Sequence, residues 1–289
     1  MNTVRASASP AAALPAAGGT THVLHHGLCQ DGFGAAWAAW QALGDRAQYL
    51  PVQHGDPPPE LPEDARVVIA DFSYAREVIL ALRERVASLT ILDHHKTAEE
   101  ALRGIPDTVF DMDKSGAMLA WEYFHPDAEP PAIIRYVQDR DLWRFALPDS
   151  MEVNAALGSY PNTFEIWSGL DLDVLRQEGR AILRFRDQTV ASIVGFARIG
   201  DVGGHEVPVT NATAHWSDVG AALLERFPDA PFAALYHDDS EGRRRWSLRS
   251  SGEFDVSELA KRFGGGGHRA AAGFREAPRP FTPPSPADS

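Results

Sequence analysis

A pair of histidines directly follows a short apolar segment in the first half of the chain. Residues 89–92 favour β structure, and Asp93, His94 and His95 come directly after them. In an open α/β sheet, ligands bind at the carboxyl ends of the strands. Two imidazoles and a carboxylate at such a place suit a hard divalent metal ion and a phosphate. Taken alone, the tripeptide is equally consistent with a polar loop after a strand.

Two further apolar segments lead into residues of the same kinds. Residues 67–70 form a second strand-like segment, which ends at Asp71. A third, residues 21–24, is followed by His25, His26 and Asp31. Strands of this kind, alternating with helical segments, predict a parallel sheet whose edge collects all of these side chains.

A carboxylate pair farther along the chain, Asp139 and Asp141, adds to this set. Both fit a ligand role. Asp139 is preferred, because Asp141 precedes a Leu-Trp pair that is typical of a core. Carboxylates and imidazoles with few thiols favour manganese or magnesium over a structural zinc ion.

These motifs resemble those of the DHH phosphoesterase family. The tripeptide Asp93-His94-His95 matches the motif that names the family, and the His/Asp-Gly and lone Asp motifs upstream match its companions. Residues 264–273 read Gly-Gly-Gly-Gly-His-Arg-Ala-Ala-Ala-Gly and resemble the glycine-rich motif of the DHHA1 domain, which follows many DHH domains. Together the motifs span roughly residues 20 to 276.

The resemblance implies two metal ions, manganese with magnesium as the alternative, which activate water for attack on a phosphate ester. Asp71 is the implied bridging ligand. The implied catalytic residues are His95, which would stabilise charge or protonate the leaving oxygen, and Asp93 beside it. The full set of implied metal ligands is His25 or His26, Asp31, Asp71, His94 and Asp139.

The first motif departs from the pattern of many relatives, which is His-x3-Asp-x-Asp. Counted back from Asp31, the first Asp falls on Cys29 and the His falls on His25. His26 is the alternative ligand if the loop is one residue tighter. A thiolate can bind a metal, whereas a lone cysteine is more often a small buried residue. The sequence leaves the role of Cys29 open.

The glycine-rich motif has a physical rationale of its own. Consecutive glycines expose backbone N–H groups and let a phosphate or a base approach closely. We expect a helix over residues 255–263 before the glycines, and His268 and Arg269 at the start of a helix after them. Arg249 resembles the arginine with which DHHA1 domains bind phosphate. The implied substrate-binding residues are Arg249, Gly265, Gly266, Gly267 and His268.

The alternation of strands and helices predicts an α/β fold with two domains. The first is a parallel, doubly wound DHH catalytic domain over residues 21–200, including linker helices. The second is a smaller α+β DHHA1 domain over residues 203–276. Residues 1–20, rich in Ala, Ser, Pro and Gly, are predicted to be a disordered leader, and residues 277–289 a disordered tail.

Composition restricts the partners and the location. The chain has 289 residues, a single cysteine and a formal net charge of −13. One cysteine allows no intrachain disulfide, which fits a reducing cytoplasm, and no apolar segment approaches the ~18 residues of a membrane span. The acidic balance argues against binding to long duplex nucleic acid. Relatives are often dimers, so the resemblance leaves a homodimer open.

The expected function is therefore hydrolysis of phosphate esters in small nucleotide substrates. The family implies short single-stranded oligonucleotides, linear dinucleotides or a nucleoside 3′,5′-bisphosphate, gripped between two domains that open and close. One alternative is hydrolysis of inorganic pyrophosphate or polyphosphate, against which the DHHA1-like motif argues. The other is a catalytically weak nucleotide-binding protein, which the position of Cys29 makes plausible.

Overall fold

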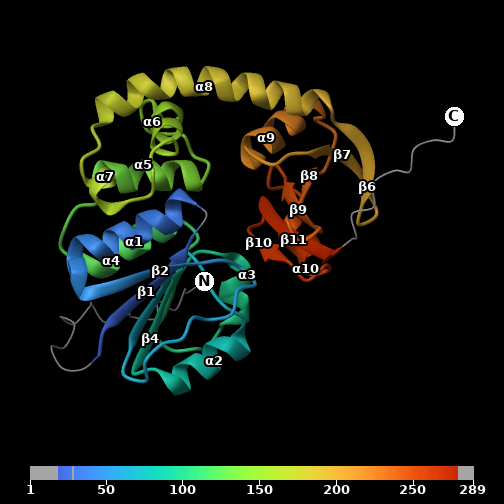
Figure 1. Ribbon diagram of the computed structural model, residues 1–289. Coiled ribbons are helices and arrows are strands. Elements are labelled where there is room, and N and C mark those ends of the chain that lie inside the picture. The colour runs from blue at the N-terminus through green and yellow to red at the C-terminus, as the bar shows by residue number, and fades with distance from the viewer. Residues whose placement is uncertain (1–18, 28, 279–289) are drawn as a thin grey trace, which may run out of the picture. The chain divides into compact units, whose positions relative to one another are not determined.

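The computed structural model describes residues 19–27 and 29–278, and the chain divides into two compact units between Leu183 and Arg184 (Figure 1). The first unit contains β1 (Thr21–His26), α1 (Gln30–Leu43), a 3₁₀ turn (Gly44–Arg46), β2 (Ala47–Val52), β3 (Arg66–Ala70), α2 (Arg76–Arg85), β4 (Ser88–Asp93), α3 (Lys96–Ala101), β5 (Thr108–Phe110), α4 (Gly116–Phe124), α5 (Ala132–Asp141), α6 (Ser150–Leu157) and α7 (Phe164–Ser168). Helix α8 (Leu172–Gly195) contains the division.

The second unit continues with β6 (Arg198–Val202), β7 (His205–Asn211), α9 (Trp216–Arg226), β8 (Ala233–Asp238), β9 (Arg243–Arg249), α10 (Val256–Lys261), β10 (Gly266–Gly267) and β11 (Ala271–Pro278). Most of the predicted leader and tail, residues 1–18 and 279–289, lies outside the described residues. Strand β11 extends two residues into the predicted tail. Among the described residues, no helix is both long enough and apolar enough to cross a membrane.

The sheet of the first unit is parallel throughout, with the strand order β2-β1-β3-β4-β5. Its register places Ile69 of β3 between Leu24 of β1 and Ile91 of β4. The chain leaves β1 toward β2 on one side and returns to β3 on the other. The carboxyl ends of β1 and β3 therefore flank a topological switch point, which is where ligands bind in open α/β sheets.

Helices cover both faces of this sheet, as Figure 1 shows for α1 and α4 on one face and α2 on the other. The pattern of β3 explains the layering, because successive side chains of a strand point to opposite faces. Val68 and Ala70 pack in the core formed with α1 and α4, whereas Val67 and Ile69 pack in the core formed with α2. The predicted doubly wound α/β fold is confirmed.

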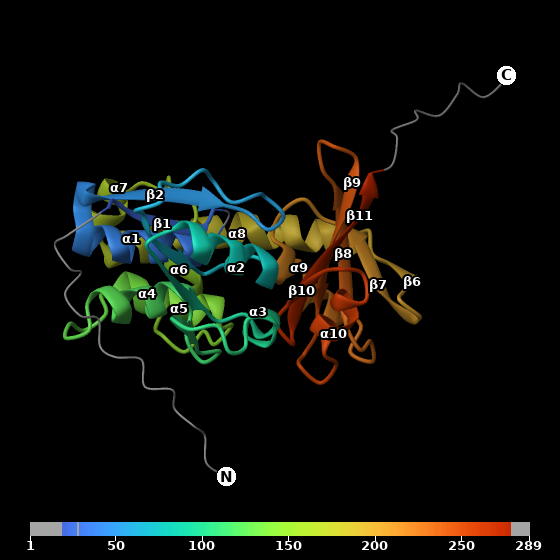
Figure 2. The same ribbon diagram turned by 90° about the horizontal axis from the view of Figure 1, so that it is seen from below.

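The sheet of the second unit has the strand order β10-β11-β9-β8-β7-β6 (Figure 2) and is antiparallel except between β7 and β8. Helix α9 packs on one face through Val219 and Leu223. Helix α10 packs on the other through Val256 and Leu259. The unit is the small α+β domain that the sequence predicted.

The helix expected after the glycine motif is wrong, because residues 271–278 form strand β11. Ala272 pairs with Leu248 of β9, and Phe274 pairs with Trp246. Ala272 and Phe274 are buried in the core of this unit. The alanines favour a helix by propensity, but pairing with β9 and burial of alternate side chains override that preference.

Two glycines of α8 differ in what surrounds them, and this difference generates a stability prediction. A Cβ on Gly179 would stand 2.0 Å from the carbonyl oxygen of Glu152 in α6, whereas one on Gly195 would meet no described atom within 4 Å. We expect Gly179→Ala to lower the free energy of unfolding by about 1–3 kcal/mol, because the backbones of α6 and α8 must separate. Gly195→Ala, the matched control, should change it little. Urea denaturation followed by circular dichroism measures both, and equal effects would contradict this packing.

Candidate active site

Asp71 lies at the centre of the site and comes directly after β3. Its φ of 55° is in the left-handed region, which is uncommon for a residue other than glycine. Its N–H donates a hydrogen bond to the carbonyl of Leu92 at 2.9 Å, and the residue is 2% exposed. This turn directs a buried carboxylate into the space beyond the strand ends. A backbone of this kind persists where the surroundings hold it, and it occurs often at functional sites.

Two glycines allow helices to begin close to the strand ends, one of them against Asp71. A Cβ on Gly116, the first residue of α4, would stand 2.4 Å from the Cβ of Asp71. A Cβ on Gly32, in the first turn of α1, would stand 2.2 Å from the carbonyl oxygen of His26. Both approaches are too close for any side chain. This close packing explains why small residues are needed at these two positions.

The two oxygens of Asp71 face two different groups of side chains. Oδ2 accepts a hydrogen bond from the thiol of Cys29 at 3.1 Å and lies 3.7 Å from Nδ1 of His26. Oδ1 lies 3.1 Å from Nε2 of His94. We call His26, Cys29 and Asp71 the Cys29 triad, because one atom from each lies within 4.8 Å of the others. By the same measure, Asp31, His94 and Asp141 form the His94 triad.

The His94 triad concentrates negative charge around a buried imidazole. Nε2 of His94 lies 3.6 Å from Asp31 and 3.7 Å from Asp141, in addition to its contact with Asp71. Burial opposes protonation of His94, but the hydrogen bond with Asp71 and the nearby carboxylates of Asp141 and Asp31 raise its pKa to about 10. Two buried carboxylates, Asp31 and Asp71, and the more exposed one of Asp141 require a compensating positive charge. A divalent cation among these oxygen and nitrogen ligands would supply it, and the residues fit such an ion.

Asp31 is held by the start of helix α4. Its Oδ2 accepts a hydrogen bond from the N–H of Gly116 at 2.6 Å, and its Oδ1 accepts one from Ala117 at 2.9 Å. The positive end of the helix dipole favours a carboxylate at this place. Burial nevertheless raises the pKa of Asp31, and so do the neighbouring carboxylates of Asp71 and Asp141.

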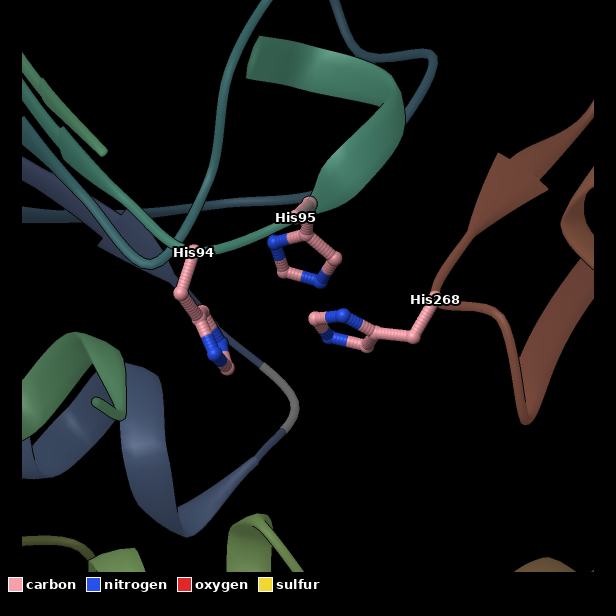
Figure 3. A group of neighbouring side chains, drawn as sticks. All are labelled: His94, His95 and His268. Carbon is pink, nitrogen blue, oxygen red and sulfur yellow. The ribbon is translucent and has the colours of Figure 1, made fainter. Parts of the chain in front are cut away.

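Asp93, the first residue of the DHH motif, positions the two histidines that follow it, His94 and His95, which Figure 3 labels. Its carboxylate is fully buried and accepts hydrogen bonds from the Ser73 hydroxyl at 2.5 Å and from the N–H groups of His94 and His95 at 2.7 and 3.2 Å. Nδ1 of His95 lies 2.6 Å from the same carboxylate. Burial lowers the pKa of His95, but Asp93 raises it above its usual value on balance. Asp93 thus fixes the orientation of a His95 ring that is 20% exposed.

The structure places Asp141 beside His94, whereas the sequence favoured Asp139. The carboxylate of Asp139 instead accepts hydrogen bonds from the N–H groups of Ala146 and Leu147 at 2.9 and 3.1 Å, and so holds the loop after α5. Asp139 and Asp141 are two positions apart on α5, which corresponds to about 200° of rotation around the helix axis. Their carboxylates therefore point in nearly opposite directions. The argument from a Leu-Trp core also fails, because Trp143 is 42% exposed.

Of the two histidines that the sequence left open, His26 enters a triad. Nδ1 of His25 lies 3.2 Å from the carbonyl oxygen of His26, and its ring packs edge-on against Phe33. Burial lowers the pKa of His25 to about 4. The sequence analysis did not single out His54, whose ring lies 5.5 Å from that of His26 and 6.1 Å from that of His95. The signal in the sequence that could have identified His54 is its position just after β2.

In the second unit, Arg249 is oriented by hydroxyl groups. Its Nη1 donates to Oγ of Ser247 at 2.9 Å and its Nη2 to Oγ of Ser217 at 3.2 Å. A Cβ on Gly220 of α9 would stand 2.5 Å from Cγ of Arg249, so the stem of the arginine lies against that helix. The fork of the guanidinium is therefore held in a fixed direction.

The glycine motif forms a tight loop around the short strand β10. A Cβ on Gly265 would stand 2.0 Å from the carbonyl oxygen of Gly273, and Gly267 has a φ of 137°. His268 lies in the turn between β10 and β11, where its N–H donates to the carbonyl of Ala271 at 2.7 Å (His268 is labelled in Figure 3). Arg269 donates from Nε to the carbonyl of Gly252 at 2.6 Å, so it holds a neighbouring loop.

Comparison with known proteins identifies this second unit. Residues 209–277 match the family model of the DHHA1 domain. The second unit of the chain therefore contains a DHHA1 domain. The matched range begins within β7, ends within β11 and includes both Arg249 and the glycine motif.

Relatives of this chain include two curated proteins. The chain is 31% identical over 283 residues to uncharacterized protein R106 of Acanthamoeba polyphaga mimivirus, a match that covers 87% of this chain and 66% of R106. It is 39% identical over 70 residues to oligoribonuclease NrnB of Bacillus subtilis (strain 168), which covers 24% of this chain and 17% of NrnB. The chain thus spans just under two thirds of the first relative and under a fifth of the second.

A solved structure also aligns with the chain. It is that of the pGpG-specific phosphodiesterase PggH from Vibrio cholerae. The alignment covers 89% of this chain and 93% of PggH, at 13% identity and a TM-score of 0.48.

The contacts of Asp93 predict the effect of an isosteric change. In Asp93→Asn, an amide group would face backbone and ring N–H groups that need an acceptor. We expect the free energy of unfolding to fall by about 1–3 kcal/mol, because a buried donor loses its partner. Asp127→Asn, at an exposed position, is the control and should leave stability unchanged. Thermal unfolding in the absence of metal tests this, and equal melting temperatures for both variants would refute the positioning role.

Proposed function

We propose that the chain is a metal-dependent phosphoesterase that hydrolyses small nucleotide substrates. One observation carries the proposal: Asp71 stands between two ligand triads at the switch point of a parallel sheet. Independent loop residues rarely gather in this way. The DHH motif supplies His94 to one of these triads and Asp93 as the partner of His95.

The residues that would hold metal ions are His26, Cys29, Asp31, Asp71, His94 and Asp141. Asp141 replaces Asp139 in this proposal, and His26 is preferred to His25. When bound, divalent ions such as Mn²⁺ or Mg²⁺ lower the pKa of a water molecule and neutralise charge on a phosphate. Asp71 has one oxygen for each triad, which is the arrangement that a bridging carboxylate needs.

His95 is the proposed general acid. Its Nδ1 lies against the buried carboxylate of Asp93, which fixes the ring and leaves Nε2 as the atom that delivers a proton to the leaving oxygen. Asp93 acts through His95, because its own oxygens accept hydrogen bonds from Ser73 and from the DHH backbone. His95 is partly exposed, so a substrate phosphate can approach its ring.

The DHHA1 domain is the proposed substrate-binding part. The guanidinium of Arg249 suits two-point contact with a phosphate, and the N–H groups of glycine-rich backbone suit the same ligand. The proposed residues are Arg249, Gly265, Gly266, Gly267 and His268. The net charge of −13 fits short anionic ligands better than long polymers. The names of NrnB and PggH describe an oligoribonuclease and a phosphodiesterase for a linear dinucleotide, in line with short oligonucleotides as substrates.

The test is release of phosphate or mononucleotide from a small panel of substrates with Mn²⁺, Mg²⁺ or a chelator. The panel holds a 5′-phosphorylated dinucleotide, a five-nucleotide RNA, adenosine 3′,5′-bisphosphate, a cyclic dinucleotide and pyrophosphate. We expect hydrolysis of a linear nucleotide that needs a divalent ion and stops with chelator. His95→Gln should lower turnover by about 100-fold or more, as loss of a general acid does. Asp113→Asn, at an exposed position, is the matched control for charge removal.

Asp71→Asn separates the two alternatives that remain. It should abolish turnover and weaken metal binding, because one amide cannot serve two ions as a carboxylate does. Hydrolysis of pyrophosphate alone would replace the nucleotide substrate with an inorganic one. Nucleotide binding without turnover of any substrate would overturn the enzymatic proposal and leave a binding protein.

A further inference from the structure

The Cys29 triad has the dimensions of a metal site with mixed ligands. Sγ of Cys29 lies 3.1 Å from Nδ1 of His26 and 3.1 Å from Oδ2 of Asp71, and the latter two atoms are 3.7 Å apart. With metal bonds of about 2.3 Å to sulfur and about 2.0–2.2 Å to nitrogen and oxygen, tetrahedral geometry separates ligand atoms by roughly 3.3–3.6 Å. The three atoms need to move only a few tenths of an ångström to hold one ion.

The two triads differ in the kind of ion that their atoms prefer. The His94 triad offers two carboxylates and an imidazole, to which Asp71 adds a further oxygen. Hard oxygen ligands of this kind suit Mn²⁺ and Mg²⁺. The Cys29 triad offers one sulfur, one nitrogen and one oxygen. A soft sulfur ligand selects Zn²⁺ and other thiophilic ions against Mg²⁺.

Cys29 is the N-cap of α1, and its sulfur accepts a hydrogen bond from the N–H of Gly32 at 3.2 Å. Burial and the carboxylates of Asp71 and Asp31 raise the pKa of the thiol well above its usual value, and the hydrogen bond from Gly32 opposes this rise. Capping alone does not account for the residue, since Ser, Asp and Asn are the preferred caps. Binding of an ion would release the thiol proton to solvent and leave the sulfur as a metal ligand.

We infer that the two proposed metal positions are unequal: the Cys29 triad takes a thiophilic divalent ion such as Zn²⁺, and the His94 triad takes Mn²⁺ or Mg²⁺. This inference rests on the proposed function only in placing metal ions at the two triads. Asp71 serves both ions, through Oδ2 on one side and Oδ1 on the other. Cys29 then determines which ion occupies one half of the site.

Cobalt spectroscopy on the full chain tests the ligand directly. Co²⁺ replaces Zn²⁺, and a Co²⁺–thiolate bond gives a charge-transfer absorption band that oxygen and nitrogen ligands do not give. Cys29 is the only cysteine in the chain, so the band can come from no other residue. We expect one equivalent of Co²⁺ to produce the band in the metal-stripped native protein and in Asp141→Asn. The band should be absent in Cys29→Ser and Cys29→Asp, both of which keep a side chain that can cap α1.

A competition experiment tests the selectivity. The native protein and Cys29→Asp are dialysed against equal concentrations of Zn²⁺ and Mn²⁺, and the bound metals are then measured. We expect the native protein to retain both ions and Cys29→Asp to lose preference for Zn²⁺ by about tenfold or more, a change of the size that altered metal sites show. Zn²⁺ should also slow the reaction of Cys29 with a thiol reagent, whereas Mg²⁺ should not.

The outcomes separate this inference from the proposed function. Binding of Co²⁺ to the native protein without a thiolate band would overturn the inference even if nucleotides are hydrolysed. An unchanged ratio of Zn²⁺ to Mn²⁺ in Cys29→Asp would do the same. A thiolate band together with no hydrolysis of any substrate would support the unequal metal positions while the phosphoesterase proposal fails. Circular dichroism of each variant shows whether it is folded, and Cys29→Ser and Cys29→Asp must both lose the band.

Discussion

The structure of the first unit depends on bringing a buried carboxylate, Asp71, against three other chain segments. The left-handed backbone of Asp71 aims its side chain beyond the end of β3, and α4 can begin there only because Gly116 has no side chain. The same start of α4 supplies two N–H groups to Asp31. A single close approach of backbone to carboxylate therefore brings Asp71 after β3 and Asp31 of α1 together at the start of α4. The core of the sheet serves mainly to hold these ends in register.

Electrostatics explains why this arrangement fits a cation. Asp31, Asp71 and Asp141 surround one imidazole, and the pKa of His94 rises while that of Asp31 also rises. A raised pKa in both an imidazole and a carboxylate indicates a local excess of negative charge around them. Asp93 shows the contrasting case, because its buried carboxylate is satisfied by hydrogen bonds from Ser73 and from the two histidines. The buried carboxylate of Asp93 is thus satisfied by hydrogen bonds, whereas those around His94 are the proposed metal ligands.

The sequence predicted which residues directly follow strands. It did not predict which side of a helix faces the site. Asp71 and His94 could be predicted, because a strand end fixes where the next residue lies. Asp141 could not, since the choice between it and Asp139 depends on the rotation of α5 and on a loop that claims Asp139. Strand β11 was missed for a similar reason: its partner β9 is distant in sequence, and pairing outweighs the helix propensity of alanine.

The strand order explains why the two oxygens of Asp71 have different neighbours. In the sheet, β3 lies between β1 and β4, so Asp71 at its end has one neighbour on each side. The last residue of β1, His26, and Cys29 in the loop after it lie near Oδ2, and His94, directly after β4, lies near Oδ1. A substitution at Cys29 therefore alters the surroundings of one oxygen and leaves those of the other in place. Because sheet order assigns each oxygen of Asp71 to a different segment, the proposed metal positions can differ in their ligand chemistry.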